Sequence, residues 1–372
     1  MHIAANTGFL ILYGRDRGKG AERVKIEVAV FGLVAAFVIL GTLITVNAPQ
    51  LQPAGAKSGL PVLGKAPELA GIKGWLNSEP LTIAGLKGKV VLVDFRTDSC
   101  INCIRTLPYL KDWHAKYADQ GLVTIGVHTP EFEFEKGYDN VKAAIAKYGI
   151  KYAVAQDNDY ATWNAFQNRY WPRKYLVDAD GNMRYDHIGE GGYAETERAI
   201  QSLLAEAGAK VAANMTKVKE TTDYRSIGTP ELYLGYGFAR APLGNPEGFQ
   251  PGTVVEYRPA ATSQDNTVYL YGSWKNENDR MIAVSDGTVR LMYTAKEVNI
   301  VAGGNAGLAI LLDGKTLTSE NLGSDGALEN GTARVTIDAH RLYNIVSTPV
   351  YGTHLLEIRA EPGFELYTFT FG

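Results

Sequence analysis

The two cysteines of this chain, Cys100 and Cys103, are separated by two residues and follow an apolar, β-rich run at residues 89–95. An amphipathic stretch, residues 104–117, comes directly after them. A strand, a short polar turn and a Cys-x-x-Cys pair that opens a helix are the local geometry of a thiol–disulfide exchange site. This feature constrains the fold because it requires a strand and a helix joined at the cysteines.

The expected helix start explains why cysteines at this spacing can be reactive. Unpaired backbone N–H groups and the positive end of the helix dipole favour a thiolate there. We therefore predict that Cys100 is an exposed nucleophile that attacks a partner disulfide. Cys103, one turn further on the same face, is predicted to resolve the mixed disulfide.

Other uses of a cysteine pair fit the sequence less well. Structural zinc normally needs four ligands, and the chain has no second cysteine pair. Attachment of a c-type haem needs a histidine where Ile104 stands. A static disulfide remains as the simpler alternative. We expect no metal and no cofactor beyond a redox-active Cys100–Cys103 disulfide.

The N-terminal part of the chain is predicted to anchor it in a membrane. Residues 28–46 are apolar apart from two threonines, and as a helix they would extend about 29 Å, enough to cross a bilayer. Cations precede this segment and few follow it closely, so residues 1–27 are expected in the cytoplasm and the rest outside, in the periplasm of a cell with an inner membrane. A cleavable signal peptide is the alternative.

Length and composition indicate two folded domains behind this segment. The chain has 372 residues and a net charge of −3, and it has no basic block outside the N-terminus, so we expect no nucleic-acid partner. Residues 47–65 are rich in Pro, Gly, Ala and Ser and are predicted to be a flexible tether. The predicted domains are 66–208 and 224–372, with a polar linker at 209–223.

Strand and helix patterns alternate in the first domain, whereas the second domain has strand patterns alone. In the first domain, a hairpin around Asp180-Gly181 gives a mixed edge to an α/β sheet. The second domain is predicted to be an all-β sandwich with a jelly-roll arrangement. Expected strands are 90–95, 122–128, 152–155, 175–177 and 184–188, then 253–258, 268–274, 289–293, 298–302, 309–312, 333–337, 343–347, 354–360 and 365–371. Expected helices are 101–120, 138–148 and 194–206.

The first domain resembles the thioredoxin fold. Asp94 stands in the strand before the cysteines, where thioredoxins keep a buried acid, and Trp171-Pro172 precedes a strand, where they keep a cis-proline. The resemblance implies that Asp94 has a raised pKa and moves the proton of Cys103. It also implies that a cis Pro172 presents the backbone of Trp171 to a substrate strand. A strand-end acid paired with a lysine is the simpler interpretation of Asp94.

Further motifs are similar to the DipZ branch of TlpA-type thioredoxins. They lie at residues 99–103, 105–108, 126–132, 159–165, 168–172 and 189–191. This resemblance implies an extracytoplasmic thiol–disulfide protein associated with cytochrome c maturation. Full-length DipZ-like proteins also carry a multi-span electron-transfer domain, so we expect a separate membrane protein to supply electrons to this chain.

Three departures from the relatives bear on reactivity. Arg96 and Asp98 replace an expected tryptophan and aromatic residue, with opposite effects on a Cys100 thiolate. Thr106 replaces a glutamate found in many TlpA-type proteins, so proton transfer would depend on Asp94 or on Glu131. His128 at a strand end is expected to be structural.

The predicted C-terminal domain resembles carbohydrate-binding modules in DipZ-type proteins. Five aromatic residues could stack on sugar rings, although aromatic residues at alternate strand positions often belong to a core. These are Tyr233, Tyr236, Tyr269, Tyr271 and Trp274. A docking or spacer domain is the alternative.

The sequence as a whole favours a membrane-anchored thiol–disulfide oxidoreductase that reduces disulfides of envelope proteins. A peroxiredoxin-like peroxidase is one alternative, because Thr97-x-x-Cys100 matches part of that family's element, although Val93 stands where its proline belongs. The other is an envelope-binding protein anchored by its sandwich domain. Copper delivery fits less well, because copper chaperones of this fold favour a Cys-x-x-x-Cys spacing.

Overall fold

A computed structural model describes residues 51–372 apart from 53, 213, 220, 221 and 261. The predicted cytoplasmic segment 1–27 and the predicted span 28–46 lie outside the described residues. Within the described part of the chain, no helix is long and apolar enough to cross a membrane.

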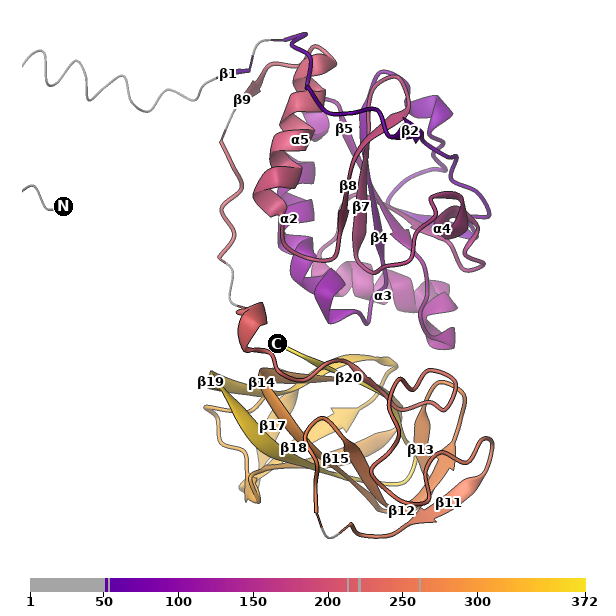
Figure 1. Ribbon diagram of the computed structural model, residues 1–372, viewed down its shortest axis with the longest axis vertical. Coiled ribbons are helices and arrows are strands. Elements are labelled where there is room, and N and C mark those ends of the chain that lie inside the picture. Colours follow the sequence, from indigo (N-terminus) through magenta and orange to yellow (C-terminus); the bar gives the residue numbers. More distant parts are fainter. Residues whose placement is uncertain (1–50, 53, 213, 220–221, 261) are drawn as a thin grey trace, which may run out of the picture. The chain divides into compact units, whose positions relative to one another are not determined.

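The N-terminal half of the described chain forms a seven-stranded mixed sheet in the order β2-β8-β7-β4-β5-β6-β3 (Figure 1). The central strands β4, β5 and β6 are parallel, and β7, β8, β2 and β3 are added antiparallel. The prediction of an α/β sheet with a mixed edge is confirmed. The strands are β2 (Gly64–Lys65), β3 (Gly74–Leu76), β4 (Val90–Arg96), β5 (Leu122–His128), β6 (Ala153–Gln156), β7 (Arg173–Val177) and β8 (Asn182–Ile188).

Helices cover both faces of this sheet, and for that reason all of β4 is buried. One apolar cluster joins the sheet to α2, α3 and α5 and has the fully buried Trp113 of α2 in it. A second cluster joins the other face to α4, where Trp163 and Phe166 pack edge-on against Phe95 of β4. The helices are α2 (Ile101–Tyr117), α3 (Tyr138–Tyr148), α4 (Ala161–Ala165) and α5 (Tyr193–Glu206). Among the described residues, four short 3₁₀ helices lie at Ala84–Leu86, Ala118–Gln120, Glu133–Lys136 and, before the C-terminal domain, Tyr224–Ser226.

The predicted tether and linker are more ordered than their composition indicated. β1 (Leu51–Gln52) pairs antiparallel with β9 (Val211–Ala212), one strand from each segment. Arg184 Nη2 donates to the Leu60 carbonyl at 2.7 Å, and the Ser58 N–H donates to Glu206 Oε2 at 3.1 Å. The flexible-tether prediction therefore needs correction from about Ser58 on, because a Gly- and Pro-rich composition does not reveal hydrogen bonds to the segment's own backbone.

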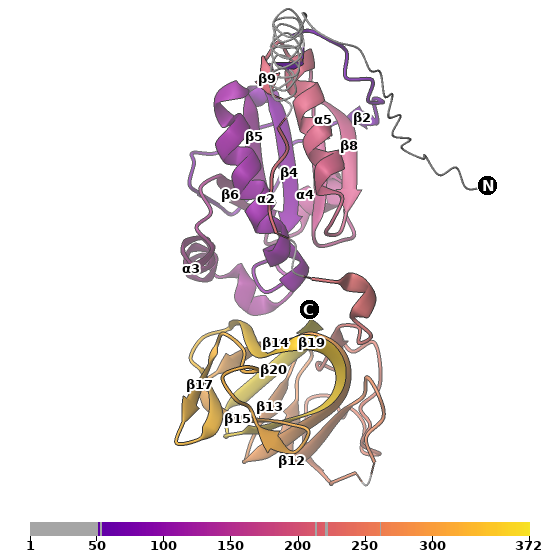
Figure 2. The ribbon, with the colours of Figure 1, turned by 90° about the vertical axis from the view of Figure 1, so that its left-hand side faces the viewer.

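The C-terminal part is an all-β domain, as predicted, and its main correction concerns strand length. The predicted strands 289–293 and 298–302 are one strand, β14 (Gly287–Gly304), and 343–347 and 354–360 are one strand, β19 (Arg341–Ala360). These two strands pair along most of their length, with register shifts near Ala295 and Val298 (Figure 2). Such bulges bend a strand and interrupt its alternation, so in the sequence they resemble turns.

β14 joins two sets of partners into one hydrogen-bonded sheet of eleven strands among the described residues. Its first half pairs with β12 and its second half with β20, so the sheet folds over a shared apolar core. The jelly-roll connection stays a prediction. The other strands are β10 (Leu232–Tyr233), β11 (Val254–Tyr257), β12 (Val268–Asn276), β13 (Met281–Ala283), β15 (Ala306–Leu312), β16 (Lys315–Thr316), β17 (Gly326–Glu329), β18 (Thr332–Ile337) and β20 (Phe364–Phe371).

Candidate active site

Cys100 occupies the N-cap position of α2, as the sequence predicts. Its backbone is extended, and its Sγ accepts a hydrogen bond of 3.1 Å from the backbone N–H of Cys103. The two sulfurs are free thiols in this structure. The helix start therefore places one orphan backbone donor directly on the first thiol, which is the arrangement that stabilises a thiolate.

Burial opposes this stabilisation. Cys100 is 9% exposed and Cys103 1% exposed, so the first cysteine is the more accessible but is not the open nucleophile that we predicted. Burial raises the pKa of the Cys100 thiol, the hydrogen bond and charge of Cys103 and the charge of Glu231 raise it further, and the Cys103 N–H lowers it. Desolvation therefore destabilises a Cys100 thiolate more than the hydrogen bond from one backbone N–H stabilises it.

Asp94 of β4 is a fully buried acid, as the thioredoxin resemblance implies. Its carboxylate lies 3.8 Å from Lys174 Nζ of β7, the strand that pairs with β4. Burial raises the pKa of Asp94, whereas the charges of Lys174 and Arg96 lower it. The sequence left two interpretations of Asp94 open, a buried acid and an acid paired with a lysine, and the structure shows that both hold.

Lys174 connects this acid with the thiols. Burial lowers the pKa of Lys174, whereas the charges of Asp94, Cys103, Glu190 and Cys100 raise it. Sequence reasoning passed over Lys174, although its place two residues after Pro172 was a usable signal. The buried lysine, the acid and both cysteines therefore belong to one electrostatic cluster.

The two charged departures from the family pattern pair with each other. Arg96 is fully buried and its Nη2 lies 2.9 Å from Asp98 Oδ1. His128 is also buried, with Nδ1 3.5 Å from Asp98 and Nε2 2.9 Å from the Glu135 carbonyl. His128 is therefore held inside the fold by the Glu135 carbonyl and lies next to Asp98, in agreement with the structural role predicted for it.

Glu135, which sequence reasoning missed, joins two loops at the site. One carboxylate oxygen accepts from the Ser99 N–H at 3.1 Å and the Ser99 hydroxyl at 2.6 Å. The other accepts from the Glu131 N–H at 2.6 Å and the Phe132 N–H at 3.0 Å. Only half of a capping box forms here, because the Glu135 carboxylate accepts from the Phe132 N–H but Phe132 has no side-chain acceptor. The sequence therefore lacks the Ser/Thr-x-x-Glu signal that would have pointed to Glu135.

Removal of the Ser99 hydroxyl is expected to destabilise the protein. In Ser99→Ala the buried Glu135 carboxylate loses a short charge-assisted hydrogen bond, so the free energy of unfolding should fall by about 1–3 kcal/mol. Urea titration of the full chain measures this change. Ser285→Ala, at an exposed loop position, is the matched control and should stay within about 0.5 kcal/mol. Equal effects of the two substitutions would contradict the assignment.

The peptide bond between Trp171 and Pro172 is cis, as predicted from the resemblance. The Trp171 indole N–H donates to the Thr129 carbonyl at 3.0 Å, and its ring packs 4.3 Å from that of Trp163. The Pro172 carbonyl accepts from the Gly189 N–H at 2.8 Å. The loop that begins at Thr129 therefore contacts Trp171 on one side and, through Glu135, Ser99 on the other.

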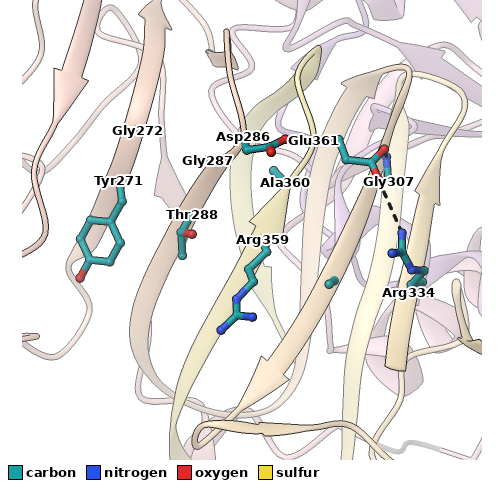
Figure 3. A pocket seen from close by; sticks show the side chains of 11 residues that line it. Tyr271, Gly272, Asp286, Gly287, Thr288, Gly307, Arg334, Arg359, Ala360 and Glu361 are labelled. Carbon is teal, nitrogen blue, oxygen red and sulfur yellow. Dashed lines mark hydrogen bonds and ion pairs between the residues drawn. The ribbon is translucent and has the colours of Figure 1, made fainter. Parts of the chain in front are cut away.

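The five aromatic residues considered for sugar stacking divide into core and surface. Trp274, Tyr269 and Tyr233 are at most 7% exposed, whereas Tyr236 is 37% exposed. Tyr271 lines an open hollow of about 390 Å³ on the outer face of the sheet, with Thr288 and Arg359 on the adjacent strands (Figure 3). At the far side, Arg334 pairs with Glu361. The stacking role is thus excluded for the buried members, and sugar binding stays a prediction.

A dithiol at the start of a helix, after the central parallel strand of a mixed sheet and with a cis-proline before the neighbouring strand, defines a thioredoxin-like protein. Comparisons agree with this class. Residues 64–186 match the family described as AhpC/TSA family, and residues 229–372 match the thioredoxin like C-terminal domain.

Three curated relatives cover different shares of the chain. Protein DipZ of Mycobacterium tuberculosis (strain CDC 1551 / Oshkosh) is 38% identical over 339 residues, which are 88% of this chain and 46% of DipZ. Thiol-disulfide oxidoreductase YkuV of Bacillus subtilis (strain 168) is 33% identical over 140 residues, 38% of this chain and 94% of YkuV. Thiol-disulfide oxidoreductase ResA of Bacillus cereus (strain ZK / E33L) is 27% identical over 128 residues, 34% of this chain and 71% of ResA.

The chain therefore belongs to the thioredoxin-like family of thiol–disulfide oxidoreductases. It is similar to DipZ through both of its folds, and it spans just under half the length of that protein.

Proposed function

We propose that this chain is a membrane-anchored, extracytoplasmic oxidoreductase that reduces disulfides of envelope proteins, with Cys100 and Cys103 as its redox group and no further cofactor. The observation that carries the proposal is the N-cap geometry of Cys100, with the Cys103 N–H on its sulfur. The buried Asp94–Lys174 pair supports it, because it provides a proton acceptor in the same cluster.

The proposed reaction transfers two electrons in two exchanges. The Cys100 thiolate attacks one sulfur of the substrate disulfide, a new S–S bond forms, and the other substrate sulfur leaves as a thiolate that takes up a proton. Cys103 then gives its proton to Asp94 and attacks Cys100 Sγ, which releases the second substrate thiol. The dithiol is oxidised to a Cys100–Cys103 disulfide, and the substrate disulfide is reduced to two thiols. Trp171 and Pro172 are proposed to receive the extended substrate segment.

The location and partners are proposed from the sequence and from the relation to DipZ. The apolar segment 28–46 would hold the chain in the inner membrane with both folds in the periplasm. A separate membrane protein would reduce the disulfide after each cycle. Apocytochrome c, during its maturation, is the proposed example of an envelope substrate, and the carbohydrate contact of the C-terminal domain is a further proposal centred on Tyr271.

The reduction potential of the Cys100–Cys103 couple tests the direction of the reaction. The full chain in detergent is equilibrated with glutathione or dithiothreitol buffers, and its thiols are counted by alkylation and mass spectrometry. We expect a potential below about −220 mV, since a donor must be more reducing than the disulfides it serves. A higher potential would overturn the reductase assignment, and a value above about −180 mV would indicate an oxidant or isomerase.

Peroxide consumption separates this proposal from the peroxidase alternative, which the match to the AhpC/TSA family keeps in view. A peroxidase needs only the first thiolate for its reaction with peroxide. Rapid peroxide consumption by Cys103→Ser would therefore favour the peroxidase. Reduction of a protein disulfide by the native chain without rapid peroxide consumption supports the oxidoreductase.

A further inference from the structure

Two glutamates from distant parts of the chain share one tyrosine hydroxyl. The Tyr233 hydroxyl lies 2.6 Å from Glu131 Oε1 and 3.3 Å from Glu231 Oε2. Glu131 follows β5, whereas Tyr233 and Glu231 belong to the C-terminal domain, at β10. A phenol has a single proton and cannot donate to two carboxylates at once. The second carboxyl group can form a hydrogen bond with the same hydroxyl only as the donor, and for that it needs a proton of its own.

These three residues lie beside the cysteine loop. The Glu135 carboxylate accepts hydrogen bonds from the backbone N–H groups of both Ser99 and Glu131. Ser99, the residue before Cys100, and Glu131 are therefore bonded to the same carboxylate. The charge of Glu231 acts on Cys100 directly and raises the pKa of its thiol, after burial and Cys103. The C-terminal domain thus contributes a charged group to the surroundings of the first thiol.

Aromatic packing fixes this arrangement. The ring of Phe132 lies 5.1 Å from that of Tyr367, 5.6 Å from Phe238 and 6.3 Å from Tyr233. Phe132 is 1% exposed, so the loop that carries Glu131 is buried against the C-terminal domain. The glutamates cannot separate without exposing these rings.

We propose that Glu131, Tyr233 and Glu231 form a proton-sharing group that controls the ionisation of Cys100, so that the C-terminal domain sets the pH dependence of the nucleophile. This inference rests on the proposed function and adds a regulator to its site. While the group holds its shared proton it carries one negative charge. When that proton leaves, a second negative charge appears and disfavours the Cys100 thiolate.

Other charged and titratable groups face this one and modulate it. Burial, together with the charges of Glu135 and Glu231, raises the pKa of Glu131 to about 8 against the opposing effects of Tyr233 and Arg240. Burial also raises the pKa of Glu231, against the effects of Arg240, Tyr233 and Arg105. The groups that face the pair are Glu135, Tyr160, Arg105, Glu190, Cys100 and Arg240, whose guanidinium lies 4.5 Å from the Tyr233 ring centroid.

The pH profile of Cys100 alkylation tests the proposal. Iodoacetamide labelling of the full chain, in a Cys103→Ser background so that one thiol titrates, is quantified by mass spectrometry between pH 5 and 10. We expect a profile broader than a single-proton curve, because the group ionises in the same range. Glu231→Gln should give a single-proton curve with a lower midpoint and labelling roughly threefold to tenfold faster at pH 8. Glu131→Gln should also give a single-proton curve, with less change in its midpoint, since Glu231 then keeps its charge.

Glu329→Gln, at an exposed position of β17, is the matched control and should leave the profile unchanged. A native profile that fits one proton, or one that stays broad in both glutamate variants, would overturn the inference. Because Phe132 packing could suffer in a variant, circular dichroism and the unfolding midpoint are compared with those of the native chain. A failure of disulfide reduction by the native chain would count against the proposed function alone, since the alkylation profile does not depend on turnover.

Discussion

A Cys103→Ser variant is expected to retain its substrate as a covalent mixed disulfide through Cys100. The Cys103 thiol is 1% exposed and its backbone N–H contacts Cys100 Sγ, so it is placed to attack that sulfur once a substrate is attached. A serine hydroxyl cannot do this, and turnover should fall at least about a hundredfold. Non-reducing electrophoresis of membranes from cells expressing the variant, followed by mass spectrometry, identifies the trapped protein and the cysteine that holds it.

The controls for this experiment come from the same pair of cysteines. Cys100→Ser and the double variant should form no adduct, because the first thiolate is missing. Release of the trapped partner by dithiothreitol shows that the link is a disulfide. An adduct on Cys103 of the Cys100→Ser variant would reverse the assigned roles of the two cysteines. If Cys103→Ser formed no adduct that dithiothreitol releases, neither role would stand.

Local sequence signals predicted the first and last residues of some elements correctly. The strand Leu122–His128 and the helix Tyr138–Tyr148 have the predicted bounds. The helix has a clear stop, because Gly149 takes the left-handed conformation with φ of 63° that terminates helices. Where apolar periodicity and a terminating glycine agree, the sequence alone locates an element.

Strands of the C-terminal domain were harder to predict because their alternation is interrupted or very short. β14 and β19 contain register shifts that split each into two apparent strands. β10 and β16 have two residues each and β13 has three, which is too few for a period of two to be recognised. Bulges and short edge pairings depend on the partner strand, and the partner is not visible in the local sequence.

The site divides in the same way. Cys100, Cys103 and the cis Pro172 were predicted from motifs, and Asp94 was placed in the correct buried position. The groups that modify them come from elsewhere in the chain: Lys174 pairs with Asp94 only because β7 lies beside β4, and Glu231 acts on Cys100 only because β10 lies near Glu131. The error about Cys100 exposure has the same origin, since a helix-start argument includes the local dipole but not the burial that the rest of the fold imposes.

Substitution of Lys174 is expected to destabilise the thioredoxin-like fold strongly. Among the described residues, Lys174 makes the ion pair of Asp94, and both side chains are 0% exposed. Lys174→Met keeps the length of the side chain but leaves the acid without its cation. Loss of one partner from a buried pair costs about 3–5 kcal/mol, because the remaining charge keeps its desolvation penalty. Urea unfolding at pH 7, followed by tryptophan fluorescence, measures the loss.

The pH dependence of this loss distinguishes a stranded charge from a packing defect. In the variant, the folded pKa of Asp94 rises further above its unfolded value, so the folded state holds a proton that the unfolded state releases. The deficit should therefore be smallest below the folded pKa that Asp94 has in the native chain, because Asp94 is protonated in both folded proteins there. It should grow as the pH rises from that pKa toward the higher folded pKa of the variant. A packing defect would cost the same at every pH.

Two further variants complete the test of the pair. Asp94→Leu combined with Lys174→Met removes both charges, and it should recover most of the stability because no buried group is then left ionised. Lys142→Met, at an exposed position of α3, should change the unfolding free energy by less than about 0.5 kcal/mol. Two results would contradict the idea that Lys174 stabilises the buried Asp94 charge. One is a loss of unfolding free energy in Lys174→Met no larger than that in Lys142→Met, and the other is a double variant less stable than Lys174→Met. A recovered double variant would in turn give a folded protein without the acid, in which the contribution of Asp94 to proton transfer from Cys103 can be measured directly.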